Sequence, residues 1–360
     1  MAATTPTAEL SLCMSSRISV LPPSDYLLSR DVCSYGYFLL APNRWDVHRE
    51  CLGRAFLLSD GPVYAEIEQP NGQGGALRIV LSRALSSNER RDFVTQVTRM
   101  LRLDEDSAHI AAFHAVDPRW QKLGRGRLYR SPTLFEDVLK TVTSCNVQWP
   151  GTISMNRRLC EVLGEHVELG WDGSRVVLGG GGRRSRRPTD ARVRLYAFPS
   201  PEKIARTRPA TLRARCRTGY RDQRIVELAR LFATSPSRGG VDQAWMEDPN
   251  TPDEDLHEAL LELPGVGPYA AANIMQLLGR YARLPLDTES VRHGRSLLGY
   301  KGTSAQVMKK VKAHYAPFGE HAFRSYWFEM WEFYESKHGP AHTWDRDTTG
   351  AMFTAALLSK

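Results

Sequence analysis

Two glycines one residue apart stand in the segment Leu263-Pro264-Gly265-Val266-Gly267, between two stretches with helical patterning. Glycine adopts backbone conformations that other residues avoid, so this pair permits a very tight turn between helices. The backbone N–H groups of such a turn point outward at the start of the second helix, where the helix dipole favours an anion. The segment therefore predicts a hairpin that binds a phosphate without reading a base. The alternative is a glycine that only ends the first helix.

A carboxylate follows the second of these helices. Asp287 comes after the short apolar run 284–286, eighteen residues beyond Tyr269. Such a run can bring the carboxylate back toward the mouth of the hairpin. Asp287 can also cap the helix that follows it, and capping is compatible with catalysis. Because the hairpin lies nearby in the sequence, we predict that Asp287 is the catalytic residue.

The segment 16–125 is predicted to form an antiparallel sheet backed by a helix. Short runs rich in Val, Ile, Tyr and Phe alternate there with turn residues, which is typical of strands. The predicted strands are 34–41, 54–58, 63–69 and 77–82, and the helical spacing of 88–101 predicts the helix.

The segment 126–345 has helical patterning. Apolar residues at helical spacing predict helices over 131–145, 155–167, 200–216, 221–234, 254–263, 270–280, 304–316 and 322–337. The last helix carries an aromatic stripe, of which most is predicted to be core and one or two members to line a pocket. The fold class predicted is α+β, with a sheet unit followed by an all-helical unit.

An insertion at about 170–194 interrupts the helices. Four glycines and four arginines stand between residues 179 and 187. Such a segment cannot form a core, and we predict a mobile basic loop. It is either a solvated linker or an arm that contacts nucleic-acid phosphates.

The composition limits the class of protein. The 48 Lys and Arg residues exceed the 40 Asp and Glu residues, which suits a polyanionic partner without establishing one. None of the six cysteines forms a CxxC pair and none follows Cys216, so no zinc or iron–sulfur spacing is present. We find neither a membrane-spanning run nor a secretory signal, and we expect a cytosolic protein without a membrane partner.

The hairpin, the loop after it and Asp287 together resemble the signature of the helix-hairpin-helix DNA glycosylase superfamily. Within it the chain resembles the 3-methyladenine and 8-oxoguanine glycosylases, because the segment 219–221 (Gly-Tyr-Arg) is similar to that of both and the segment 143–146 is similar to that of 8-oxoguanine glycosylase. The resemblance implies a TATA-binding-protein-like sheet domain over 16–125 and a helical glycosylase domain over 126–345, with the Gly/Arg insertion inside it.

The resemblance implies roles for the matched residues. Asp287 stabilises the positive charge that remains on the sugar when the base departs, and it can orient or deprotonate the attacking water. Asn146 fills the gap left by the flipped base with Gln148 assisting, although Asn146 can instead be a helix C-cap. The candidate contacts to the DNA backbone are Tyr220, Arg221 and Arg292.

Lyase-competent members of the superfamily carry a lysine two residues after the second hairpin glycine. This chain has Tyr269 there. Tyrosine cannot form the Schiff base of the lyase reaction, so we expect hydrolysis alone, with Tyr269 stacking on the extruded base or lining its pocket. The chain departs from the superfamily's iron–sulfur variant because it lacks the cysteines, so we expect no metal and no iron–sulfur cofactor, with a monovalent cation at the hairpin as the one ion considered.

The function implied is base excision repair. The enzyme flips a damaged base out of duplex DNA and hydrolyses its N-glycosidic bond. Alkylated purines are the predicted substrates because they are cationic and suit an aromatic pocket; oxidised, deaminated or mispaired bases are the alternatives. A non-catalytic helix-hairpin-helix protein that binds lesions would keep the hairpin without needing Asp287. We expect a monomer on damaged double-stranded DNA, located in the cytoplasm at the nucleoid of a prokaryote or in the nucleus of a eukaryote.

Overall fold

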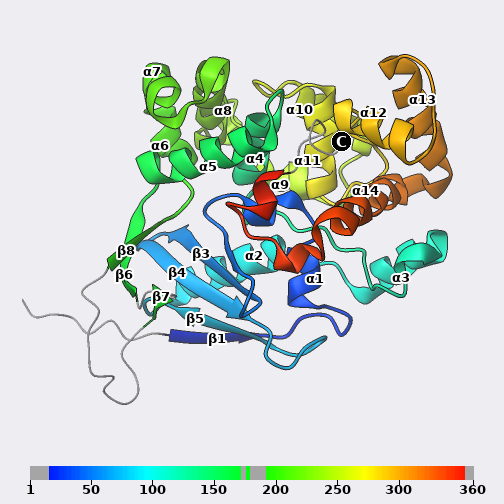
Figure 1. The fold of residues 1–360 in the computed structure, drawn as a ribbon. Coiled ribbons are helices and arrows are strands. Elements are labelled where there is room, and N and C mark those ends of the chain that lie inside the picture. The colour runs from blue at the N-terminus through cyan, green and yellow to red at the C-terminus, as the bar shows by residue number, and fades with distance from the viewer. Residues whose placement is uncertain (1–15, 172–175, 179–191, 353–360) are drawn as a thin grey trace, which may run out of the picture.

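The computed structural model describes residues 16–171, 176–178 and 192–352 (Figure 1). An antiparallel sheet lies at one side of the molecule, and helices from the later part of the chain stand over and beside it. No helix in these described ranges is both long and apolar enough to cross a membrane.

The first sheet is built from the strands that precede residue 82. In the described part of the chain it has five strands, in the order β1-β5-β4-β3-β2, and every pairing is antiparallel. Three predicted strands are confirmed as β3, β4 and β5, whereas β1 and β2 have no counterpart among the predictions. The strands are Ser16–Val20 (β1), Arg44–Asp46 (β2), Cys51–Leu58 (β3), Gly61–Glu68 (β4) and Leu77–Leu81 (β5).

The strand predicted at 34–41 is wrong. The chain there follows a short helix, α1 (Leu28–Val32), and turns through a 3-10 helix, η1 (Gly36–Leu39). Residues 34–41 are all buried, so their apolar composition reflects packing on every side and not strand pairing. A Cβ on Gly36 would lie 3.0 Å from the ring of Trp149, and the glycine therefore allows this turn to pack closely against the helical part.

The helix predicted at 88–101 is confirmed as α2 (Ser87–Leu101), which packs on β3. The hydroxyl of Ser86 accepts a hydrogen bond from the Glu89 N–H, and the Glu89 carboxylate accepts one from the Ser86 N–H, which forms a capping box. The ring of Phe93 meets the ring of Phe56 on β3 at 4.9 Å between centroids. The apolar side of α2 thus closes one face of the sheet.

A second sheet occupies part of the predicted insertion. In the described residues its strand order is β7-β6-β8, and Leu169 and Leu195 pack on Ala55 and Tyr64 of the first sheet. The helix predicted at 155–167 is shifted, because its last residues belong to β6, and the insertion is not entirely loop. Residues 179–191, with the glycines and arginines, lie outside the described residues. The elements are Trp149–Leu163 (α5), His166–Trp171 (β6), Val176–Val177 (β7) and Arg192–Tyr196 (β8).

The remaining predicted helices are confirmed with shifted ends, except at 200–216. That stretch divides into α6, α7 and a π-helical turn over Leu212–Cys216, because Pro209 lacks the N–H needed to continue α6. The helices are Ser107–Val116 (α3), Leu134–Ser144 (α4), Pro201–Ala205 (α6), Pro209–Thr211 (α7), Asp222–Ala233 (α8), Gln243–Glu247 (α9), Asp253–Leu261 (α10), Pro268–Leu277 (α11), Thr288–Ser296 (α12), Ser304–Tyr315 (α13) and Ala322–His338 (α14).

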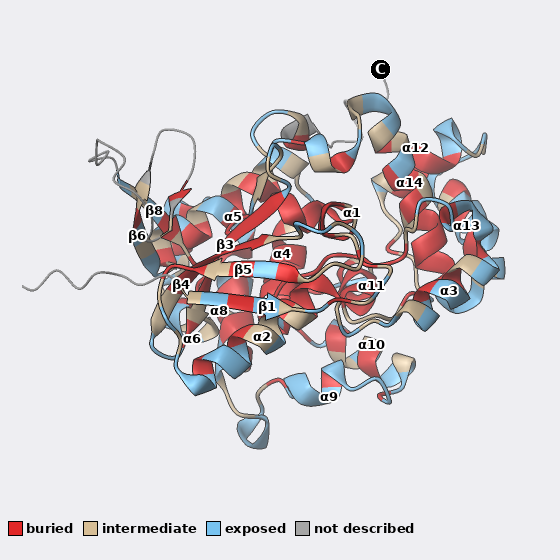
Figure 2. Ribbon diagram, turned by 90° about the horizontal axis from the view of Figure 1, so that it is seen from below, coloured by how far each residue is buried: buried red, intermediate tan, exposed pale blue. Residues whose placement is uncertain are grey.

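Buried contacts join α11 and α14 to the part of the chain that forms the first sheet. Figure 2 shows that buried residues follow α11 and much of α14 as well as the strands. Arg102, just after α2, donates hydrogen bonds of 2.8 Å to the carbonyls of Gln276 and Leu277 at the end of α11. Sheet and α14 residues share one apolar core, so the division into domains at residue 125 stays a prediction.

Candidate active site

A cavity of about 1680 Å³ lies between the segment 35–37 and residues of the helical part of the chain. Its walls come from the turn before α11, the turn between α4 and α5, both ends of α12, the first half of α13, α14 and the residues around η1. Four of the five predicted hairpin residues (all but Pro264) line this cavity, as do Tyr269, Asn146, Gln148 and Asp287. The structure therefore brings together candidate residues that are up to 141 positions apart in the sequence.

The predicted hairpin is present between α10 and α11. Gly265 has a φ of 86°, in the left-handed region, and the buried side chains of Leu263 and Val266 anchor the turn. Gly267 is the N-cap of α11, is exposed, and has no atom within 4 Å of where a Cβ would stand. Pro268 follows at the first helical position, so the N-terminus of α11 opens on free space beside Gly267.

Asp287 caps α12, as one of its two predicted roles requires. Its Oδ1 accepts hydrogen bonds from the N–H groups of Glu289 (2.9 Å) and Ser290 (3.1 Å), and the Ser290 hydroxyl accepts one from the Asp287 N–H. None of the hydrogen bonds among the described residues ends on Oδ2. Burial raises the pKa of Asp287 to about 6, and the nearby Glu289 carboxylate adds to the rise, which the capping bonds oppose.

The raised pKa of Asp287 predicts a stability effect. In the unfolded chain the carboxyl ionises near pH 3.8 and in the folded chain near pH 6, so folding loses stability as the pH rises through this interval. Asp287→Asn removes the charge and keeps a capping oxygen. We expect the free energy of unfolding at pH 7 to rise by about 1–2 kcal/mol, a value reduced for the partial exposure of the side chain.

Urea denaturation of both proteins at pH 7 and at pH 4 measures this difference. The gain is expected to shrink toward zero at pH 4, where the wild-type carboxyl is protonated in the folded state. A variant that is less stable than the wild type at pH 7 would show that the fold stabilises the carboxylate.

Aromatic rings form the walls of the cavity next to Asp287. The stripe on α14 contributes more than the one or two pocket residues predicted, because Tyr326, Trp327, Met330, Trp331 and Tyr334 all line the cavity. The Trp327 and Trp331 rings stack at 5.3 Å between centroids. Most of these side chains are nevertheless buried, so the predicted core role also holds.

A residue that sequence analysis missed completes this wall. Tyr35, just before η1, packs its ring 4.7 Å from that of Trp327 and donates a hydrogen bond of 3.2 Å to the Asn273 Oδ1. Asn273 in turn donates to the backbone oxygen of Tyr269 at 3.2 Å. The signal was the aromatic run 34–41, which the sequence analysis assigned to a strand.

Asn146 stands at the tip of the turn between α4 and α5. It is exposed, with a φ of 50°, and follows the C-cap residue Cys145 of α4, close to the alternative role considered for it. Arg221 donates to the carbonyls of both residues, at 3.3 Å for Asn146, and its guanidinium lies 4.5 Å from the Tyr220 ring. Arg221 therefore holds this turn, while Tyr220 and Gln148 are exposed beside it.

Among the described residues three arginines line the cavity, namely Arg224, Arg292 and Arg295, and the first two differ in their burial. Arg292, a predicted DNA-backbone contact, is buried in the wall, where its Nε donates to Glu289 at 2.5 Å and its guanidinium lies 4.2 Å from the Phe333 ring. Arg224 on α8, which was not among the predicted contacts, is exposed and approaches the hairpin at Gly265. By position, Arg224 suits a phosphate contact better than Arg292.

The fold is that of known DNA glycosylases. The structure covers 99% of the 3-methyladenine DNA glycosylase from Archaeoglobus fulgidus with 88% of this chain, at a TM-score of 0.61 and 15% identity. It covers 92% of the apo 8-oxoguanine glycosylase/lyase from Clostridium acetobutylicum with 82% of this chain, at a TM-score of 0.54 and 17% identity. This chain has the helix-hairpin-helix glycosylase fold. The resemblance predicted from the hairpin is confirmed.

A sequence relative of this chain is also a DNA glycosylase. The DNA-3-methyladenine glycosylase of Bacillus subtilis (strain 168) is 22% identical over 222 residues. The match covers 60% of this chain and 64% of the relative, so the chain spans less than two thirds of that protein's length. No family model matches the sequence. The roles of single residues in this glycosylase fold stay predictions.

Lysine is missing from the cavity wall formed by the described residues. Tyr269, which the resemblance matched to the lyase lysine, lies in the first turn of α11, and burial raises its pKa, with the Asp287 carboxylate adding to the rise. Lys140 is fully buried on α4, where it pairs with Glu136 at 2.7 Å and lies 5.6 Å from the ring of Tyr37. Tyr37 itself lines the cavity.

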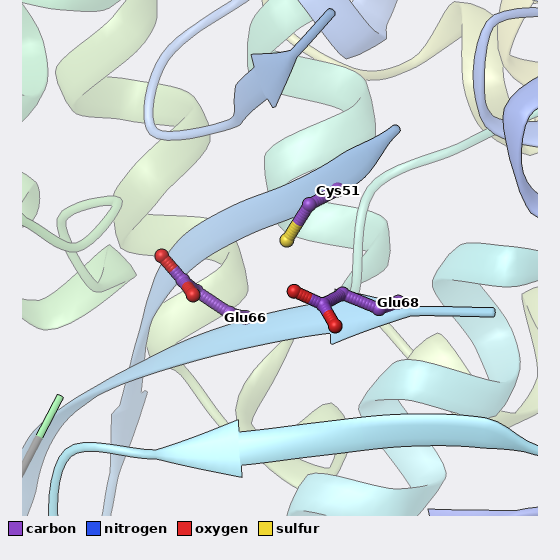
Figure 3. A group of neighbouring side chains, drawn as sticks. All are labelled: Cys51, Glu66 and Glu68. Atoms are coloured by element: carbon purple, nitrogen blue, oxygen red, sulfur yellow. The ribbon is translucent and has the colours of Figure 1, made fainter. Parts of the chain in front are cut away.

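A group with metal-ligand chemistry lies on the first sheet, away from the cavity. Figure 3 shows Cys51 on β3 beside Glu66 and Glu68 on β4. Arg49 pairs with Glu66 at 2.9 Å and also with Glu68, and burial raises the pKa of the Cys51 thiol. Arg78 also pairs with Glu68, so two arginines balance the two carboxylates, and the group is an ion-pair cluster on two inner strands of the sheet.

Proposed function

We propose that this protein is a DNA glycosylase that hydrolyses the N-glycosidic bond of a damaged base, with alkylated purines as its substrates. The observation that carries the proposal is the placing of Asp287. Its half-buried carboxylate lines the same cavity as an open helix N-terminus and a wall of aromatic rings. A phosphate, a sugar and a base need these three kinds of contact at neighbouring positions.

Each group of residues in the cavity acts in a different step of the proposed reaction. The N-terminus of α11 at Gly267 holds a backbone phosphate, and the exposed Asn146 enters the base stack as the damaged nucleotide rotates out. The bond from the sugar C1′ to the base nitrogen breaks, and the base leaves with the electron pair. Asp287 stabilises the resulting positive charge and takes a proton from the water that adds to C1′.

The aromatic wall supports alkylated purines as the substrate class. A methylated purine carries positive charge, and rings such as Tyr35, Trp327 and Trp331 attract a cation through their faces. The buried Arg292 would repel that cation, but its charge is paired with Glu289. Stacking of this kind tolerates many base shapes, so oxidised bases are the second candidate, given the fold similarity to an 8-oxoguanine glycosylase/lyase.

A panel of duplexes tests the substrate class. Each duplex carries one lesion, namely an alkylated purine, 8-oxoguanine, a deaminated base or a mismatch, and alkali converts each abasic site to a strand break. We expect breaks in the alkylated duplex to exceed those in any other duplex. A preference for 8-oxoguanine would contradict the proposed substrate class but would still support hydrolysis of the N-glycosidic bond. Salt-dependent binding without release from any duplex would favour the non-catalytic alternative.

The absence of lysine from the described cavity wall predicts hydrolysis without strand cleavage. A lyase forms a Schiff base that borohydride reduces to a stable protein–DNA adduct. We expect no adduct for the wild type and an adduct for Tyr269→Lys, whose amine would stand where burial lowers a lysine pKa. The readout is a gel that separates the adduct from free protein. An adduct with the wild type would contradict the hydrolytic mechanism.

A further inference from the structure

A line of hydroxyl groups connects α14 to the Asp287 carboxylate. The Tyr326 hydroxyl lies 2.9 Å from the Ser290 Oγ, and the Ser290 Oγ lies 3.4 Å from the Asp287 Oδ1 and 3.2 Å from the Asp287 backbone nitrogen. Tyr326 and Ser290 are both buried. The three residues therefore form one chain of contacts that ends at the proposed catalytic group.

The proton count fixes the direction of this chain. A serine hydroxyl has one proton to donate and two lone pairs to accept with. The Asp287 carboxylate can only accept, so Ser290 gives its proton to Oδ1. The Ser290 oxygen then accepts from the Asp287 N–H and from the Tyr326 hydroxyl, which leaves Tyr326 as the donor. Burial raises the pKa of Tyr326, so the phenol keeps that proton throughout the pH range of the reaction.

We infer that Tyr326 is a positioning residue that acts through Ser290 to orient the Asp287 carboxylate and to hold it in its ionised form. The inference rests on the proposed function, in which Asp287 is the catalytic residue. Polarisation by Tyr326 strengthens the hydrogen bond that Ser290 donates to Oδ1. Fixing Oδ1 leaves Oδ2, which accepts no hydrogen bond from the described residues, available to the sugar and the water.

The position of Tyr326 is itself fixed by packing. Its ring contacts the rings of Tyr315 and His293 at 5.3 Å and 5.5 Å between centroids, both near-perpendicular. The other titratable or charged groups around Asp287 come from four elements: Glu289 and Arg292 from α12, Tyr269 from α11, Cys145 from the end of α4 and Tyr35 from the segment before η1. Burial raises the pKa of Tyr35, Cys145 and Tyr269, so these three stay neutral while Asp287 titrates.

A direct titration of Asp287 tests this inference. In protein labelled with carboxyl-¹³C aspartate, the Asp287 signal is assigned by its loss in Asp287→Asn and followed from pH 4 to pH 9. Tyr326→Phe keeps the ring and removes the donor, and we expect the pKa of Asp287 to rise by about 0.5–1 unit. Tyr315→Phe is the matched control, because it removes a buried hydroxyl that is bonded to His293 instead, and we expect no shift.

A double variant separates the relay from a general effect of the hydroxyl. If Tyr326 acts through Ser290, then Tyr326→Phe adds no further shift to that of Ser290→Ala. An unchanged pKa in Tyr326→Phe, or additive shifts in the double variant, would overturn the inference. Should Tyr326→Phe fail to fold, an unchanged Asp287 pKa in Ser290→Ala would overturn it, and a raised pKa would support the Ser290–Asp287 link on which it depends.

The rate of base release distinguishes this inference from the proposed function. We expect the acid limb of the pH–rate profile of Tyr326→Phe to move upward with the titration, and the rate to recover at higher pH. A purely structural role would lower the rate at every pH. Absence of base release by the wild type would refute the proposed function, while the titration would still decide whether Tyr326 controls Asp287.

Discussion

Replacement of Asp287 by asparagine is expected to lower the rate of base release by about 100-fold to 1000-fold and to leave DNA affinity within about twofold. Asparagine keeps the oxygen that caps α12 but carries no charge, so it cannot stabilise the cationic sugar or accept the proton of water. The variant should be at least as stable as the wild type at neutral pH. Loss of activity would therefore not come from unfolding.

The measurement is single-turnover base release with enzyme in excess over a methylated duplex. Asp106→Asn is the matched control, because Asp106 also caps a helix, accepts from the His109 N–H at 2.9 Å, and does not line the cavity. We expect this control to release base at the wild-type rate. An Asp287→Asn variant that keeps more than about a tenth of the wild-type rate would remove Asp287 from the catalytic role.

Gly267→Asp is expected to weaken binding to duplex DNA by about 10-fold to 100-fold while leaving the fold intact. Gly267 is the N-cap of α11, its φ is −108°, and nothing lies within 4 Å of an added Cβ. Aspartate is a better N-cap than glycine, so α11 should be as stable as before. Its carboxylate, however, would take the helix N–H groups and place a negative charge where the phosphate binds.

The Gly267→Asn variant separates the effect of the negative charge from the effect of a side chain that occupies the helix N-terminus. It caps the helix in the same way without a charge, and we expect a loss of affinity between those of the wild type and Gly267→Asp. Binding is followed by fluorescence anisotropy at several salt concentrations, and urea denaturation checks stability. Wild-type affinity in Gly267→Asp would show that DNA does not approach this helix N-terminus.

The tight turn and the helix cap, which sequence analysis predicted and the structure contains, are set by local chemistry. The turn at Gly265 needs a φ that glycine adopts readily, and Gly267 needs open space above its backbone. Both features can be recognised in the five-residue segment 263–267. Asp287 is likewise recognisable, because a short apolar run and a helix start determine its place, and the helix start is confirmed as its cap.

The parts that sequence analysis missed depend on contacts between distant segments. Tyr35 reaches the cavity because residues 34–41 pack on every side against the helical part, a condition that composition alone does not separate from a strand. The contact between Tyr326 and Ser290 joins α14 to α12, and it arises only from the packing of helices. The small second sheet was missed for a related reason, since its strands pair across the insertion.

The identity of the released product decides whether this protein is a hydrolytic glycosylase. Purified protein is incubated with duplex DNA that carries methylated purines, released bases are identified by chromatography, and strand integrity is measured before and after alkali. We expect free methylpurine in a one-to-one ratio with alkali-labile sites, and intact strands before alkali. Strand breaks before alkali, or binding without any released base, would contradict a hydrolytic glycosylase with Asp287 at its centre.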